Sequence, residues 1–275
     1  EGRSDGFSNR SGFKFVFIGL LTLGLMIPTL MLLIVVDERE NLQRDVARDV
    51  AKSWGRSQTV NGPYLVVPTV KKVWDEKAKR YRDRRIITYF TPERLNIVGD
   101  MPADYLSRGI YNVPTYRADL QVEGKFAPLN ADVIKKTNTT YNFSAAKLVL
   151  GISDVGAIKN DVAVKLDGDV VRKFKPTLGV HLNPNPGIHI DVSKAFVEDG
   201  FTYAFNLSLN GTENLNVAPV GATSNVVLSS NWQQPSFQGR FSPDQRAVSA
   251  AGVSANWSIP ALARGSMGAQ ESVRL

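Results

Sequence analysis

The stretch Phe201–Asn210, "FTYAFNLSLN", changes character at every position. Aromatic or aliphatic side chains occupy the odd positions from 201 to 209, whereas Thr, Ala, Asn and Ser occupy the even positions. Successive side chains of a strand point to opposite faces of a sheet, so this spacing predicts a half-buried β-strand. The dipeptide Asn210–Gly211 then predicts a turn, and Leu215 and Val217 predict the start of a return strand.

The same period of two recurs on both sides of this stretch. It is found in residues 116–126, 162–170 and 187–192, and Asp167–Gly168 predicts a hairpin turn inside the second of these. Beyond residue 54, only 130–136 and 193–198 are short helix candidates. Residues 56–275 are therefore predicted to form a mainly β, antiparallel, sandwich-like domain.

The composition before this domain is different. Residues 13–36, "FKFVFIGLLTLGLMIPTLMLLIVV", contain no charge apart from Lys14 at the edge. As a helix, the apolar part covers about 33 Å, which matches the hydrocarbon core of a bilayer. No small-residue cleavage site follows Val36, so we interpret the segment as an uncleaved signal-anchor that spans the membrane.

A charged helix is predicted next, over residues 37–54. Its apolar residues recur every four positions and form one stripe that is expected to pack on the domain: Leu42, Val46, Val50 and Trp54. Gly55 stands where a left-handed residue ends many helices. The predicted organisation is a cytoplasmic tail (1–12), a transmembrane helix (13–36), a juxtamembrane stalk (37–55) and a periplasmic β domain (56–275) of an inner-membrane protein.

The net charge of +7 is concentrated in one segment. Residues 71–85, "KKVWDEKAKRYRDRR", hold eight Lys or Arg against three Asp or Glu. One interpretation is a solvated hairpin, and the other is a surface for anionic lipid headgroups or an anionic envelope polymer, with Trp74 and Tyr81 suited to an interface. The expected partners are membrane lipids, other envelope proteins or a cell-wall polymer. A nucleic acid is disfavoured because the domain is expected outside the cytoplasm.

Residues with obvious chemistry are few. The absence of Cys excludes disulfides, thiol catalysis and Cys-ligated metals. His181 and His189 lack a third clustered ligand for zinc. Ser236, in "PSFQG", lacks the first Gly and the following helix of a nucleophile elbow. The sequence therefore predicts no catalytic residue, no metal and no cofactor.

Several blocks resemble the CreD family of bacterial inner-membrane proteins. The first is "ERENLQRDVARDVAKSWGRSQTVNGPYLVVP", which contains W-G-x-x-Q and G-P-x-L-x-V-P motifs. Further similar blocks follow in the family's order, at 107–126, 148–160, 214–243 and 252–265. The resemblance implies an inner-membrane protein with a large periplasmic domain, linked to envelope integrity, to the response to envelope stress and β-lactams, and to colicin tolerance. It carries over no catalytic residues. Family members continue into further transmembrane helices, so we expect this chain to be a fragment.

The first block includes a corner at 54–68, in which Gly and Pro are expected to shape the turn from the stalk helix into the first strand. A second candidate region is the aromatic and proline-rich 232–239 segment, because aromatic side chains in a loop can stack on a ligand. The candidate interaction residues are Trp54, Gln58, Gly62, Pro63, Pro68, Trp232, Pro235, Ser236, Phe237 and Gly239.

Three functions are compatible with these features. The first is a non-enzymatic envelope protein that acts structurally or through partners. The second is a periplasmic module that binds a glycan or an anionic polymer. The third is a hydrolase that uses Ser236, which would require His181 or His189 within hydrogen-bond reach.

Overall fold

The computed structural model describes residues 8–129, 138–177, 186–264 and 270–273. The chain divides into two compact units, residues 1–49 and residues 50–275. Their boundary lies inside the segment expected to form the stalk. The short helix predicted at 130–136 lies outside the described residues.

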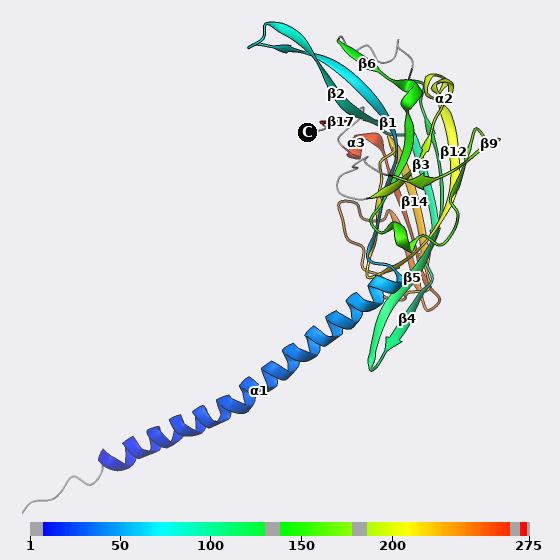
Figure 1. The fold of residues 1–275 in the computed structure, drawn as a ribbon. Coiled ribbons are helices and arrows are strands. Elements are labelled where there is room, and N and C mark those ends of the chain that lie inside the picture. The colour runs from blue at the N-terminus through cyan, green and yellow to red at the C-terminus, as the bar shows by residue number, and fades with distance from the viewer. Residues whose placement is uncertain (1–7, 130–137, 178–185, 265–269, 274–275) are drawn as a thin grey trace, which may run out of the picture. The chain divides into compact units, whose positions relative to one another are not determined.

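The first unit is helical. A single helix, α1 (Ser8–Trp54), runs through the apolar segment and the charged segment that follows it (Figure 1). By length and composition it can cross a membrane, with a mean hydropathy of 2.5 over its most apolar window. The hydroxyls of Thr22 and Thr29 donate to carbonyl oxygens four residues earlier, so these polar groups are satisfied within the apolar segment. Ion pairs between Glu40 and Arg44 and between Asp45 and Arg48 support the charged segment.

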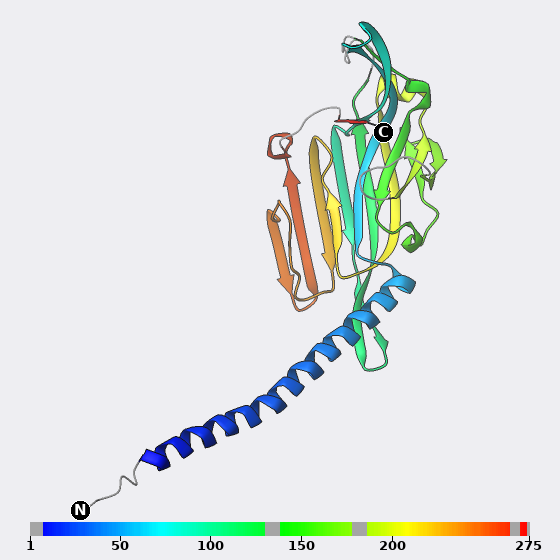
Figure 2. The same ribbon diagram turned by 60° about the vertical axis from the view of Figure 1, so that its left-hand side comes forward.

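The second unit contains two sheets (Figure 2). The first sheet has the order β10 (Lys175–Pro176), β11 (Gly187–Asp191), β7 (Lys147–Ile152), β1 (Gln58–Asp75), β2 (Arg80–Phe90) and β17 (Gln270–Val273), with β6 (Thr139–Tyr141) and β13 (Leu215–Ala218) also paired to β1. The second has the order β15 (Gln245–Ser249), β16 (Gly252–Ile259), β14 (Thr223–Ser230), β3 (Arg94–Asp100), β5 (Tyr111–Phe126), β12 (Phe201–Thr212), β8 (Ala163–Leu166) and β9 (Val170–Lys173), with β4 (Ala103–Arg108) paired to β5. Short helices are α2 (Lys194–Asp199), α3 (Ala261–Arg264), η1 (Phe143–Ala145) and η2 (Val155–Ala157).

Both sheets contribute side chains to one core. Leu148 and Leu150 of the first sheet and Leu207 and Leu209 of the second are completely buried in the same cluster. Burial in β12 alternates along the strand, as the period of two requires. The mainly β, antiparallel-rich fold class is therefore confirmed. Among the strands of the described residues, two pairs are parallel: β1 with β13 and β3 with β14.

Two local predictions are also confirmed. Strands β8 and β9 form an antiparallel hairpin whose turn residues, Asp167 and Gly168, both have positive φ. This is the backbone that an Asp-Gly hairpin turn adopts. Helix α2 (Lys194–Asp199) coincides with the short helix expected at 193–198.

The predicted turn at Asn210–Gly211 is wrong. Strand β12 continues through both residues, and Gly211 pairs with Tyr116 of β5. A Cβ on Gly211 would lie 2.3 Å from the Tyr116 ring, so glycine is needed there for close packing. The chain turns after Thr212 instead, and Leu215 begins β13, which pairs with β1 in the other sheet.

The corner at 54–68 also differs from expectation. Gly55 has φ of 146°, outside the left-handed helical region, although its N–H still donates to the Ala51 carbonyl oxygen at 3.0 Å. Strand β1 begins at Gln58, so Gly62, Pro63 and Pro68 lie within the strand rather than in a turn before it. The change from helix to strand takes place over residues 55–57, between the end of α1 and the start of β1.

A two-stranded ribbon extends from the first sheet. Strands β1 and β2 pair from Leu65–Phe90 out to Asp75–Arg80, and their distal residues, 71–85, are called the arm here. Its tip projects from the sheets in Figure 1. Because β1 has 18 residues at about 3.3 Å each, the tip lies on the order of 55 Å along the strand from Gln58. The arm and the corner at Gly55 are therefore at opposite ends of β1.

A candidate binding groove

A cavity of about 620 Å³ lies between the two sheets near the β15–β16 edge. Its walls are the apolar faces of β14 and β16 from the second sheet, β13 from the first sheet and the start of β5. Loop 231–244 covers it. We call this cavity the groove.

The loop is held at both of its ends. The Asn231 side chain accepts a hydrogen bond from the Ala103 N–H through Oδ1 and donates one to the Ala103 carbonyl oxygen through Nδ2. At the other end, the indole N–H of Trp257 donates to the main-chain oxygen of Phe241 at 3.3 Å. Between these two contacts the loop is extended and contains proline. It runs over the sheet, and the cavity lies between the loop and the sheet.

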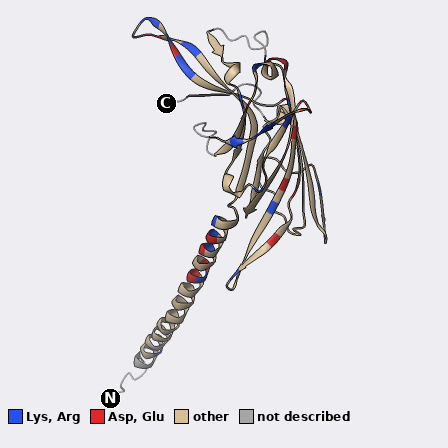
Figure 3. Ribbon diagram, turned by 45° about the vertical axis from the view of Figure 1, so that its right-hand side comes forward, with Lys and Arg blue, Asp and Glu red and all other residues tan. Residues whose placement is uncertain are grey.

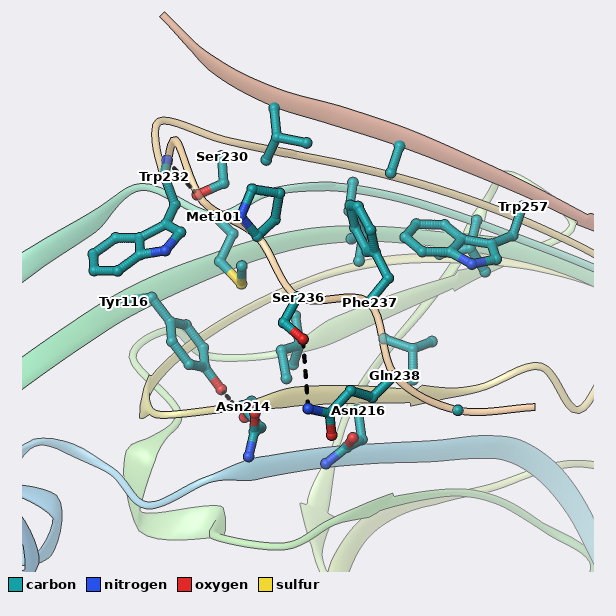
Figure 4. Close-up of a pocket in the computed structure, with 18 of the residues that line it drawn as sticks. Met101, Tyr116, Asn214, Asn216, Ser230, Trp232, Ser236, Phe237, Gln238 and Trp257 are labelled. Carbon is teal, nitrogen blue, oxygen red and sulfur yellow. Dashed lines mark hydrogen bonds between the residues drawn. The ribbon is translucent and has the colours of Figure 1, made fainter. Parts of the chain in front are cut away.

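Aromatic rings line the groove along its length (Figure 4). Trp232 lies at one end and Trp257 at the other, with Phe237 between them. Trp232 packs against Tyr105 with 5.5 Å between ring centroids, and Phe237 packs edge-on against Trp257 at 5.6 Å. Trp232 and Phe237 are both half-buried, so each keeps part of its ring available for a ligand.

The polar groups of the groove are mainly neutral. Amide side chains come from Asn214, Asn216, Gln234 and Gln238. Among the described lining residues, the ionisable side chains are Glu213, Arg240 and Tyr116. The Tyr116 hydroxyl donates to the Asn214 carbonyl oxygen at 2.7 Å. Burial raises the pKa of Tyr116 far above its ordinary value, so this hydroxyl stays protonated at physiological pH.

The structure divides the predicted interaction residues into two groups. One group lines the groove and belongs to the covering loop: Trp232, Pro235, Ser236, Phe237 and Gly239. The other group belongs to the corner and lies elsewhere: Trp54, Gln58, Gly62, Pro63 and Pro68. Proximity in sequence explains the first grouping, since one loop carries all five residues.

The corner residues build the unit rather than line the groove. The Trp54 indole donates to the main-chain oxygen of Tyr116 at 3.2 Å, and Tyr116 itself lines the groove. Gln58 is completely buried. The Gly62–Pro63 peptide is cis and lies where the β1–β7 register shifts, whereas Pro68 is exposed on β1.

Sequence reasoning missed several lining residues. Tyr116, Leu215 and Trp257 come from three strands that are far apart in the chain. Their own local signals were strand alternation and, for Trp257, membership of a motif block. Neither signal says that the three side chains converge on one cavity.

The groove brings no histidine to Ser236 within the described part of the chain. The Ser236 hydroxyl accepts from the Gln238 amide at 3.5 Å. His189 is on β11, where its ring lies 3.4 Å from the Thr177 hydroxyl, and burial lowers its pKa. His181 lies outside the described residues. Within the described residues, no three or more His, Cys, Asp or Glu side chains cluster in a way that could hold a metal ion.

An apolar helix able to cross a bilayer, joined to a β unit with an aromatic groove, defines the class of a membrane protein that carries a β domain. The chain belongs to the CreD family: residues 10–273 match the family described as "Inner membrane protein CreD". The resemblance seen in the sequence is thereby confirmed.

The similarity to a curated relative covers most of this chain. It is 28% identical over 236 residues to "Inner membrane protein CreD" of Escherichia coli (strain K12). The match covers 85% of this chain and 52% of that relative, so the chain spans about half the length of the relative. No solved structure matches.

Proposed function

We propose that this protein maintains the cell envelope as a non-enzymatic binding protein, anchored in the inner membrane by α1 with its β unit in the periplasm. The groove is proposed to bind a glycan strand of the cell wall. The observation that carries this proposal is the combination of aromatic rings and neutral amides along one cavity between the sheets. Aromatic faces pack on the apolar faces of sugar rings, and amides exchange hydrogen bonds with hydroxyl groups.

The size and shape of the groove support an extended ligand. Trp232 and Trp257 lie at its two ends, and the volume of about 620 Å³ is in the range of small-ligand sites. Because the amides outnumber the ionisable side chains, binding is expected to depend little on ionic strength. A charged ligand would be expected to show the opposite behaviour.

Replacing Trp232 with alanine is expected to weaken retention on purified peptidoglycan by about 30-fold, the scale of losing an aromatic anchor. The assay uses the full chain in neutral detergent at low and high salt. Trp74→Ala is a matched control, since Trp74 is also partly exposed and also packs on a tyrosine, at 5.2 Å. Equal losses in both variants, or no retention of the unchanged protein, would contradict glycan binding by the groove.

The same experiment tests the absence of catalysis. Peptidoglycan incubated with the protein is expected to release no soluble fragments. Release that disappears in Ser236→Ala would instead support the hydrolase hypothesis. If Ser236→Ala leaves retention unchanged, the hydroxyl is not a main contact for the glycan.

The periplasmic location is tested by labelling. The chain contains no Cys, so a single introduced thiol reports on one position. Ala250 is exposed in the turn between β15 and β16, and we expect Ala250→Cys to react with a membrane-impermeant maleimide in intact spheroplasts. Reaction only after lysis would place the β unit on the cytoplasmic side.

A further inference from the structure

The register of the arm sorts its side chains by chemistry. Side chains at directly paired positions share a face, and the face alternates at each step along the ribbon. One face carries four cations, one acid and one apolar residue: Lys71, Arg80, Arg82, Arg84, Asp75 and Val73. The opposite face carries the aromatic pair Trp74 and Tyr81 together with Lys72, Asp83 and Arg85. Figure 3 shows Lys and Arg along both strands of the arm.

The cationic face continues a face that is buried in the body of the unit. Val67 and Ile86 lie on this face and are buried in the first sheet. Further out, Lys71 and Arg84 occupy the corresponding positions, directly opposite one another. The inner face of the sheet thus changes from apolar to cationic where the ribbon leaves the core.

The three arginines form a row. Arg80, Arg82 and Arg84 are alternate residues of β2, so they are spaced by about 6.6 Å along one face. Arg82 forms an ion pair with Asp75 at 2.7 Å, whereas Arg80 and Arg84 form none among the described residues. Guanidinium groups bind phosphate oxygens through two parallel hydrogen bonds. A row of them therefore fits an extended chain of phosphate groups.

The opposite face stabilises the ribbon. The rings of Trp74 and Tyr81 are directly paired across the strands and pack edge-on with 5.2 Å between centroids. A two-stranded ribbon is marginally stable in water, and such cross-strand aromatic pairs strengthen it. The aromatic pair therefore stabilises the ribbon that carries the cationic face, while its two rings lie on the opposite side.

A need for solubility alone does not explain this arrangement. Charges of either sign keep an exposed ribbon from pairing with other strands. The arm instead has a five-charge excess of one sign, which selects an anion. A bilayer is a poorer fit than a linear polymer. Trp74 and Tyr81 lie on the face opposite the arginine row, so a bilayer could engage either the aromatic pair or the row but not both, whereas a linear polyanion needs only the row.

We propose that the cationic face of the arm binds an extended, phosphate-bearing polyanion. This site is separate from the groove, because none of the arm residues lines that cavity. The arm offers the polymer a contact at the end of β1 farthest from the corner at Gly55.

The test measures binding of linear inorganic polyphosphate to the full chain in nanodiscs of zwitterionic lipid. The triple variant Arg80→Gln/Arg82→Gln/Arg84→Gln is expected to bind about 30-fold more weakly and with a smaller salt dependence. The double variant Arg80→Gln/Arg84→Gln keeps the Arg82–Asp75 pair and is expected to lose about tenfold. A matched control, Arg108→Gln/Arg117→Gln/Arg172→Gln, removes three exposed arginines outside the arm and is expected to lose less than about threefold.

Each outcome decides the proposal. Selective loss in the arm variants supports it. Equal loss in the control overturns it, because net charge alone would then explain binding. Absence of polyphosphate binding also overturns it, and capture of phosphatidylglycerol vesicles without polyphosphate binding would replace it with a lipid contact. Trp232→Ala is expected to bind polyphosphate normally, which separates this test from that of the groove.

Discussion

Replacing Gly55 with alanine is expected to lower the thermal unfolding midpoint of the β unit by about 12 °C, from a loss of about 4 kcal/mol. A Cβ at this position would lie 2.5 Å from the Asn210 carbonyl oxygen and 2.9 Å from the Cβ of Ala157. The carbonyl belongs to β12 and is fixed in the sheet, so it cannot move aside cheaply. The φ of 146° adds strain for any residue with a side chain. The measurement is circular dichroism of the full chain in detergent on heating.

Gly109→Ala separates the two causes. Gly109 lies in the β4–β5 turn with φ of 62°, and a Cβ added there would meet no heavy atom within 4 Å. Its replacement is expected to cost about 1 kcal/mol, from backbone strain alone. If Gly55→Ala and Gly109→Ala unfold at the same temperature, the close approach to Asn210 does not contribute.

Gln58→Ala is expected to destabilise the β unit by about 3 kcal/mol, from the unsatisfied partners and the cavity left behind. Gln58 is completely buried, and its amide connects the sheets. Its Nε2 donates to the Asn210 carbonyl oxygen of β12 at 3.0 Å, and its Oε1 accepts from the Ser153 hydroxyl at 3.2 Å. The side-chain oxygen of Asn210 is already buried without a partner among the described residues, so the region has little capacity to absorb another loss.

The control for Gln58 is Gln121→Ala. Gln121 is exposed on β5, and its replacement is expected to change the free energy of unfolding by less than about 0.5 kcal/mol. Chemical denaturation of both variants, with the full chain in detergent, gives the comparison. Similar midpoints for the two variants would show that the bond between the sheets is not a major source of stability.

The two proposed surfaces divide the β unit by chemistry. The groove combines aromatic rings with neutral amides, whereas the arm combines a guanidinium row with a separate aromatic face. The groove wall is also close to the corner, since Trp54 bonds to the main chain of Tyr116, and the arm is at the far end of β1. A membrane-anchored protein with both surfaces would contact two kinds of envelope polymer at separate places on its β unit.

Hydrophobic pattern alone determined the fold class and the apolar helix. A strand with one buried face must alternate, so the odd positions from 201 to 209 predicted both the strand and its inward face. A helix that is apolar on every side over about 33 Å matches a bilayer, which made the 13–36 segment recognisable without any partner. The loop residues around Ser236 were identifiable because they are contiguous.

The tertiary structure decided what depends on residues far apart in the chain. The groove exists because the chain leaves the second sheet after β12, so that β13 pairs with β1 in the first sheet, whereas the sequence indicated a simple hairpin at Asn210–Gly211. The packing of Gly211 against Tyr116 stabilises the extended strand more than the turn propensity of Asn210–Gly211 stabilises a turn, so the strand continues. Likewise, Gly55 is required by the carbonyl of Asn210, which is distant in the chain, and Gln58 by the contact between two sheets. The local sequence pattern predicts which residues of a strand are buried, whereas a cavity forms where segments that are distant in the sequence meet.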